Sequence, residues 1–144
     1  MTQNLPSELF LAYAVPFYLY IPGEILKNTS FTFDSQRFGS HKDIMPTLYA
    51  YSLSEAEYWS VGGHNLLATQ DNQNYNFSYN TCIWADDNGV IDLTQQPYLY
   101  YSWKDKSHFL VGKQITLDDS LKQRIDNYQE LLEWSMNYLL KGYK

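Results

Sequence analysis

The stretch that decides the fold is residues 118–141, which read DDSLKQRIDNYQELLEWSMNYLLK. Apolar side chains recur there at spacings of three and four, the period of one face of an α-helix. The stripe comprises Leu121, Ile125, Tyr128, Leu132, Met136 and Leu139, broadened by Leu131, Trp134 and Tyr138. Thr116 and Asp119 have the spacing of a capping box, and Gly142 supplies a stop. We therefore predict a long amphipathic helix over 118–141, packed on one face of a sheet.

Residues 75–111 predict the sheet itself. A strand is expected over 75–85, and the turn Asp86-Asp87-Asn88-Gly89 joins it to a strand over 90–93. Further strands over 98–103 and 108–111 flank a hairpin loop at 104–107. Because connections this short join neighbouring strands, we expect antiparallel pairing.

In the first half of the chain, prolines and glycines mark the expected boundaries of helices and strands. Pro6 suits the first turn of a short helix over 6–13. The aromatic run 17–21 ends at Pro22-Gly23 and predicts a strand, and 30–33 and 47–51 are further strand candidates. Two serines, each three residues before a glutamate, predict a short helix over 54–60 that Gly62 and Gly63 end. The polar segment 68–76 predicts a loop.

These elements predict one α+β domain over residues 1–144. It comprises an antiparallel sheet of about four to six strands, a short N-terminal helix and the long C-terminal amphipathic helix. The composition agrees with a globular chain, since 44% of the residues are hydrophobic and 18% are charged. The longest apolar run, 9–21, is too short for a membrane span and lacks the flanks of a signal peptide. We expect a cytoplasmic protein that has no membrane partner.

The net charge of −6 is distributed unevenly along the chain. Residues 43–103 hold seven acidic residues and no Lys or Arg, together with eight tyrosines and three of the four tryptophans. The absence of a basic stripe argues against nucleic acid as a partner, whereas a basic protein surface suits this segment. Tyrosine favours binding surfaces, although it is also common in half-buried sheets. The predicted partner-binding residues are Glu55, Glu57, Tyr58, Trp59, Asp71, Tyr75, Asp86, Asp87, Asp92 and Tyr100.

Catalytic, metal and cofactor motifs are weak in this sequence. Cys82, His108 and an acid such as Asp86 could form a thiol nucleophile with its base, but a lone cysteine in a strand is usually a small core residue. The three histidines lack zinc-ligand spacing, and no phosphate-binding glycine loop is present. We predict no catalytic residues, no metal and no cofactor.

Three short blocks, at residues 13–19, 44–53 and 128–134, resemble a group of uncharacterised proteins from phages and mobile elements of Bacteroidetes-type bacteria. The blocks read YAVPFYL, IMPTLYAYSL and YQELLEW. They correspond in that group to an entry into a strand, a Pro-Leu-Ser segment and a C-terminal helix. The resemblance implies a bacterial cytoplasm, or the host cytoplasm for a phage protein, and carries no activity with it.

Three classes of function follow. The first is a non-catalytic accessory protein of a phage or mobile element that engages a partner protein through the acidic, tyrosine-rich surface. The second is an immunity-type inhibitor that covers the basic site of a toxin or nuclease. The third is a small enzyme that uses Cys82 or a histidine. Trp134 and Tyr138, beside the apolar stripe, could also extend the last helix toward a homodimer.

Overall fold

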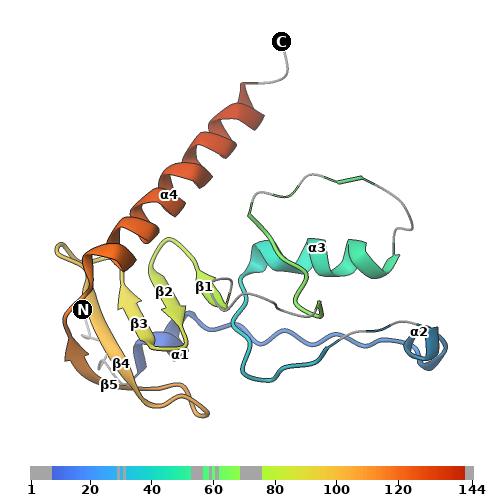
Figure 1. Ribbon diagram of the computed structural model, residues 1–144, viewed down its shortest axis with the longest axis horizontal. Coiled ribbons are helices and arrows are strands. Elements are labelled where there is room, and N and C mark those ends of the chain that lie inside the picture. The colour runs from blue at the N-terminus through green and yellow to red at the C-terminus, as the bar shows by residue number, and fades with distance from the viewer. Residues whose placement is uncertain are drawn as a thin grey trace.

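The fold is an α+β arrangement built on a five-stranded antiparallel sheet, as the computed structural model shows (Figure 1). The structure describes residues 8–28, 30, 32–52, 57–58, 60, 62–68 and 76–141. In chain order the elements are α1 (Leu9–Tyr13), α2 (Gly23–Asn28), α3 (His41–Ser52), β1 (Phe77–Tyr79), β2 (Ile83–Asp86), β3 (Gly89–Asp92), β4 (Leu99–Asp105), β5 (Leu110–Ile115) and α4 (Asp119–Leu140). The predicted fold class is confirmed.

The sheet is a meander in which each strand pairs with the next one along the chain, in the order β1-β2-β3-β4-β5. The predicted turn after Asp86 is confirmed, because Ala85 pairs with Val90 across the β2–β3 hairpin. Gly89 is required there, since a Cβ at this position would lie 2.1 Å from the carbonyl oxygen of Tyr101. The predicted β4–β5 hairpin is also present.

Both faces of the sheet are covered by apolar side chains. On one face, Phe10 of α1 and Phe38 pack against residues such as Val90 and Val111. On the other face, Ile125 of α4 packs against a cluster that includes Trp84 and Ile91. Successive strand residues point to opposite faces, so β2, β3, β4 and β5 contribute to both clusters, whereas β1 contributes Phe77 and Tyr79 to the second.

The C-terminal helix α4 confirms the strongest sequence prediction. It begins after Asp118, whose carboxylate accepts a hydrogen bond from the Ser120 amide at 3.3 Å. The expected capping box starting at Thr116 was wrong, because Asp118 is the residue with extended backbone that immediately precedes the first turn. Gly142 lies outside the described residues. The first turns pack on the sheet, and the later turns rise away from it (Figure 1).

The strand predicted over 75–85 is two strands, β1 and β2. Asn80 separates them, because its side-chain oxygen accepts hydrogen bonds at 2.8 Å from the amides of both Cys82 and Ile83. An asparagine that binds the backbone two and three residues ahead closes a tight turn. Apolar alternation alone could not reveal this interruption.

The strand predicted over 47–51 was wrong, since these residues lie in α3. Ser40 and Asp43 form a capping interaction at its start, in which the Asp43 carboxylate accepts from the Ser40 amide at 2.6 Å. Thr47, a residue that favours strands, is accommodated because its hydroxyl donates to the Asp43 carbonyl one turn earlier, at 2.7 Å. This cap and the packing of α3 override the strand preference of Thr47 and its neighbours.

The strand predicted over 17–21 was also wrong. These residues are extended, but they pair with neither edge of the sheet. α1, which precedes this segment, packs through Phe10 on one face of the sheet and contacts both β2 and the edge strand β5. The segment continues to α2, which the sequence did not predict and which follows Pro22 directly.

The remaining expectations for the first half have mixed outcomes. The short N-terminal helix is present as α1, although residues 1–7 lie outside the described part. The described residues of 30–33 form no strand, and the Thr32 amide donates to the carbonyl of Leu67. Residues 57, 58 and 60 are not helical, while 53–56, 59 and 69–75 are outside the described part. No described helix has the length and apolar character needed to cross a membrane.

Candidate functional site

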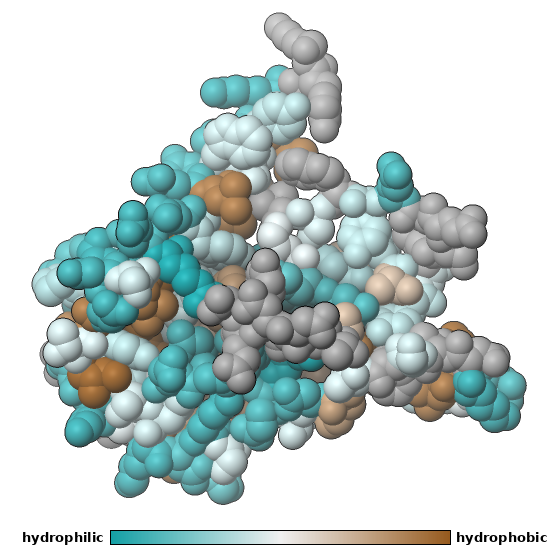
Figure 2. Space-filling view, viewed as in Figure 1, coloured by the Kyte–Doolittle hydropathy of each residue, from teal (hydrophilic) through white to brown (hydrophobic). Residues whose placement is uncertain are grey.

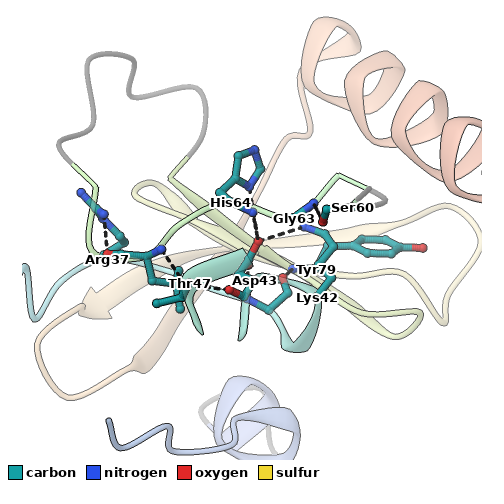
Figure 3. A network of polar contacts seen from close by, with 10 residues as sticks. Arg37, Lys42, Asp43, Thr47, Ser60, Gly63, His64 and Tyr79 are labelled. Atoms are coloured by element: carbon teal, nitrogen blue, oxygen red, sulfur yellow. Dashed lines mark hydrogen bonds and ion pairs between the residues drawn. The ribbon is translucent and has the colours of Figure 1, made fainter. Parts of the chain in front are cut away.

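Asp43 is the centre of a polar junction between the start of α3 and the loop of residues 60–68 (Figure 3). Its side chain is 2% exposed. One carboxylate oxygen accepts from the Ser40 amide, and the other accepts from the His64 amide at 2.8 Å. The His64 ring nitrogen Nδ1 lies 3.3 Å from that second oxygen. We call Ser40, Lys42, Asp43, Thr47 and His64 the Asp43 junction.

The charge state of Asp43 follows from these contacts. Burial by itself raises the pKa of the carboxyl, but hydrogen bonds from His64 and Ser40 and the nearby Lys42 ammonium outweigh it. The net result is a pKa below the ordinary value of 3.8. Asp43 is therefore a buried carboxylate at neutral pH, and each of its oxygens has a backbone donor.

A second layer of hydrogen bonds extends the junction toward residue 68. The Thr47 hydroxyl accepts from the Leu66 amide at 2.9 Å. Arg37 donates from one guanidinium nitrogen to the carbonyls of Leu66 and Ala68, at 2.5 and 2.7 Å. These bonds satisfy backbone groups of a loop that has no regular structure. The loop is thus held against α3 by side chains.

Lys42 and Tyr128 bring α4 into contact with the junction. The Lys42 ammonium lies 5.1 Å from the ring centroids of both Phe77 and Tyr128. Neither Lys42 Nζ nor the Tyr128 hydroxyl has a hydrogen-bond partner in the described part of the chain, and both atoms are buried. Burial lowers the pKa of Lys42, against the opposing effect of Asp43, and raises the pKa of Tyr128. The aromatic rings replace part of the lost hydration of the ammonium group.

The polar groups of the Asp43 junction hold the loop that contains His64 against the start of α3. The Asp43 carboxylate accepts hydrogen bonds from backbone amides. The Lys42 ammonium lies against aromatic rings and 3.8 Å from an Asp43 oxygen. Sequence reasoning missed this cluster. The spacing of Ser40 and Asp43 was the available signal, because Ser-x-x-Asp before a helical run predicts a helix start.

The structure places the predicted acidic residues in three different settings. Asp86 is buried, accepts from the Trp84 indole at 3.1 Å and from the Asn88 amide, and so holds the β2–β3 turn. Asp87 is exposed and pairs with Lys106 and with Asn76. Asp92 accepts from both the amide and the hydroxyl of Thr94. All three aspartates have local structural partners, and Lys106 offsets the charge of Asp87.

The other predicted residues are scattered. Tyr100 is buried in the sheet, where burial raises the pKa of its hydroxyl to about 12. Glu57 is exposed beside Tyr58, whose ring lies 5.1 Å from that of Tyr49. Four of the predicted residues lie outside the described part of the chain: Glu55, Trp59, Asp71 and Tyr75. The structure therefore does not bring the predicted set together on one described surface.

Cys82 and His108 occupy separate environments. Cys82 packs partly buried against the cluster that contains Phe10, and its sulfur lies 3.9 Å from the Thr81 hydroxyl. His108 lies in the β4–β5 turn, where its Nδ1 is 2.8 Å from an Asp105 oxygen. Within the described residues, no hydrogen bond joins Cys82 to a histidine, and no group of three metal-ligating side chains is present.

The most exposed apolar segment of the described chain is residues 15–21, which we call the aromatic arm. It leaves the sheet after α1 and runs to α2 at the far side of the molecule (Figure 1). Tyr18 and Tyr20 are 89% and 86% exposed, whereas Phe17 and Leu19 are less than half exposed. Two-residue alternation of this kind is typical of a strand. No described residue forms a backbone hydrogen bond with the arm.

A second exposed apolar region lies on the last turns of α4. Leu131, Trp134 and Tyr138 are all exposed, and the rings of Trp134 and Tyr138 are stacked at a centroid distance of 5.4 Å. Figure 2 shows hydrophobic residues at the surface along α4 and around α2, at the end of the arm. Surface apolar groups gathered in this way typify interaction sites.

No protein family, curated protein or solved structure matches this chain.

Proposed function

We propose that this chain is a non-catalytic protein-binding protein, and that the aromatic arm is the segment that engages its partner. The observation that supports the proposal is an extended run of aromatic and aliphatic residues whose backbone is bonded to no described part of its own chain. The resemblance to uncharacterised proteins of phages and mobile elements is compatible with this role.

The kind of partner follows from the geometry of the arm. Its backbone N–H and C=O groups are bonded to no other described residue, and Tyr18 and Tyr20 project on one side. A segment of this kind can add as a strand to an unpaired sheet edge of another protein, with alternate side chains entering pockets. Pro16 and Pro22 limit the pairing to the five residues between them, because proline cannot donate to a strand ladder.

The arm has more support as a binding surface than the acidic segment has. Asp43 and Asp86 are buried, and Asp87 is neutralised by Lys106. The immunity-type inhibitor needs exposed acidic groups that face a basic site, and these three carboxylates do not supply them. The non-catalytic assignment is supported in the same way. Asp43 is bonded to the His64 amide, and His108 is bonded to Asp105, so both side chains have structural partners.

Site-specific photocrosslinking in the native cell tests the proposal. A benzoylphenylalanine at position 18 or 20 should cross-link to one specific protein, whereas the same group at Phe33, which is 76% exposed, is the matched control. The identified protein, once purified, should bind the wild-type chain, and Tyr18→Ser with Tyr20→Ser should weaken that binding at least tenfold. Equal cross-linking at positions 18, 20 and 33, or unchanged affinity of the double variant, would contradict the proposal.

Proline substitutions test the mode of binding. In a strand, the N–H groups of consecutive residues point to opposite edges. One of Tyr18→Pro and Leu19→Pro should therefore reduce affinity far more than Tyr18→Ala or Leu19→Ala does at the same position. Equal effects of proline and alanine at both positions would show that side chains alone mediate binding.

A further inference from the structure

Three exposed apolar residues of α4 form a line that is separate from its sheet-facing stripe, on which Met136 and Leu139 are also exposed. Leu131, Trp134 and Tyr138 are 51%, 59% and 43% exposed. Asn127 and Lys141 continue the same line, giving successive spacings of four, three, four and three residues. These are the spacings of the contact positions of a coiled coil. We call these five residues the α4 seam.

The α4 seam faces away from the sheet. At 3.6 residues per turn, Trp134 lies about 180° around the helix from Ile125, the fully buried residue that anchors α4 on the sheet. The last turns of α4 also project beyond the sheet (Figure 1). A second helix can therefore lie along the seam without displacing the contacts of Ile125.

The charges beside the seam favour one orientation of a second α4. Glu130 and Glu133 precede the seam's centre, and Lys141 ends it. When two copies run antiparallel with Trp134 of each opposite Tyr138 of the other, Glu130 of each copy lies beside Lys141 of the other. A parallel pair would instead bring the two acidic turns together. Antiparallel packing also opposes the two helix dipoles favourably.

We propose that two copies of this chain associate through their α4 seams as an antiparallel helix pair. Trp134 and Tyr138 stack within each copy, so the rings are already ordered before they meet a partner. The pair buries chiefly Leu131, Trp134 and Tyr138 from each copy. That area lies below the roughly 1,200 Å² of a standard stable interface, so the dimer is a transient one. We expect a dissociation constant on the order of 10 to 100 µM.

Sedimentation velocity of the full chain, across concentrations that bracket this range, tests the proposal. The wild-type chain should shift from monomer to dimer as concentration rises. Leu131→Gln and Trp134→Ala should each weaken dimerisation at least tenfold. Leu140→Ala is the matched control, because Leu140 is 79% exposed on the same helix but lies about 120° or more around it from Leu131, Trp134 and Tyr138. It should leave the dimer unchanged, and circular dichroism should report equal helix content in all variants.

A charge exchange tests the antiparallel arrangement. Lys141→Glu or Glu130→Lys alone should weaken dimerisation about threefold or more, because each places like charges together across the pair. Combining Glu130→Lys with Lys141→Glu should restore it. Single variants that dimerise like the wild type would overturn the antiparallel arrangement.

Three other results would overturn the pairing itself. The first is a wild-type chain that stays monomeric at every concentration. The second is equal dimerisation of the Trp134→Ala and Leu140→Ala variants. The third is a dimer that is lost in the double variant Tyr18→Ser, Tyr20→Ser but kept in Trp134→Ala. The last result would place the arm, and not α4, between the two copies. Because the arm variants leave the α4 seam intact, failure of this inference is distinguishable from failure of the proposed function.

Discussion

The two halves of α4 share one apolar stripe and have different environments. In the first half, Ile125 is fully buried, and Leu121 and Tyr128 are partly covered by the sheet. In the second half, Met136 and Leu139 continue the same apolar stripe, yet both are exposed. The stripe is continuous along the helix, but the sheet covers only its beginning.

This difference shows what an amphipathic pattern does and does not specify. The period of apolar residues specifies a helix and the face that prefers to leave water. It does not specify how far the covering surface extends, because that depends on where the sheet ends. An uncovered continuation of the stripe is either solvated at some cost in free energy or covered by another molecule.

The largest expected effect is on the covered half. Ile125→Ala removes a fully buried side chain from the cluster around Trp84 and leaves a cavity. We expect the free energy of unfolding to fall by about 2 to 5 kcal/mol, measured by urea denaturation. A loss as small as that of an exposed residue would show that α4 is not anchored where the structure places it.

The Asp43 junction supports the covered half, since Lys42 lies against Tyr128. Asp43→Asn should lower the free energy of unfolding by roughly 1 to 3 kcal/mol at pH 7, because the buried donors around it lose a charged acceptor. The pKa of Asp43 is depressed in the folded state, so its stabilisation is present above the ordinary value of 3.8 and is lost as pH falls through the folded pKa. Wild-type and variant stabilities should therefore converge below about pH 4. A difference that stays constant with pH would mean that the charge of Asp43 contributes nothing.

The start of α4 should contribute less than its packing. Asp118→Ala removes the carboxylate that accepts from the Ser120 amide. The expected cost is about 1 kcal/mol, measured in the same denaturation experiment. Thr116→Ala serves as the control, because Thr116 is exposed and does not cap the helix. A larger loss in the free energy of unfolding for Thr116→Ala than for Asp118→Ala would instead support the capping box predicted from the sequence.

The smallest effect is expected at Leu139, an exposed stripe residue of the second half, in which Ser135 is buried. Leu139→Ala changes a side chain of the same stripe as Ile125, but one that is 44% exposed. The free energy of unfolding of the monomer should change by no more than about 0.5 kcal/mol. A cost near that of Ile125→Ala would mean that the second half of α4 is covered within a single copy.

Strong local patterns made much of the fold predictable. The period of α4 and the Asp-Asp-Asn-Gly turn were sufficient to place the last helix and the β2–β3 hairpin. The first half of the chain was less predictable, because its structure depends on contacts between distant residues. Thr47 lies in a helix that Ser40 and Asp43 cap, and its hydroxyl donates to the Asp43 carbonyl. The aromatic arm pairs with no described strand, although α1 before it contacts the edge strand β5.

The candidate surfaces were less predictable than the fold. Charge counted along the sequence cannot distinguish an exposed aspartate from one that, like Asp86, binds a buried indole. Trp134 and Tyr138 were predicted to lie beside the stripe, but Trp134 lies about 180° around the helix from the buried Ile125, and both residues are exposed because they face away from the sheet. The Asp43 junction joins residues 21 positions apart, which no local pattern contains.

Amide hydrogen exchange along α4, measured at two protein concentrations, tests most directly that one helix serves both the fold and an interface. Amides of residues 123–129 should be strongly protected at both concentrations, because unfolding of the sheet cluster is needed to expose them. Amides of residues 134–140 should exchange fast in the dilute monomer and slow as the concentration rises into the dimer range. Uniform protection of the whole helix, independent of concentration, would contradict the division of α4 into a covered half and an interface.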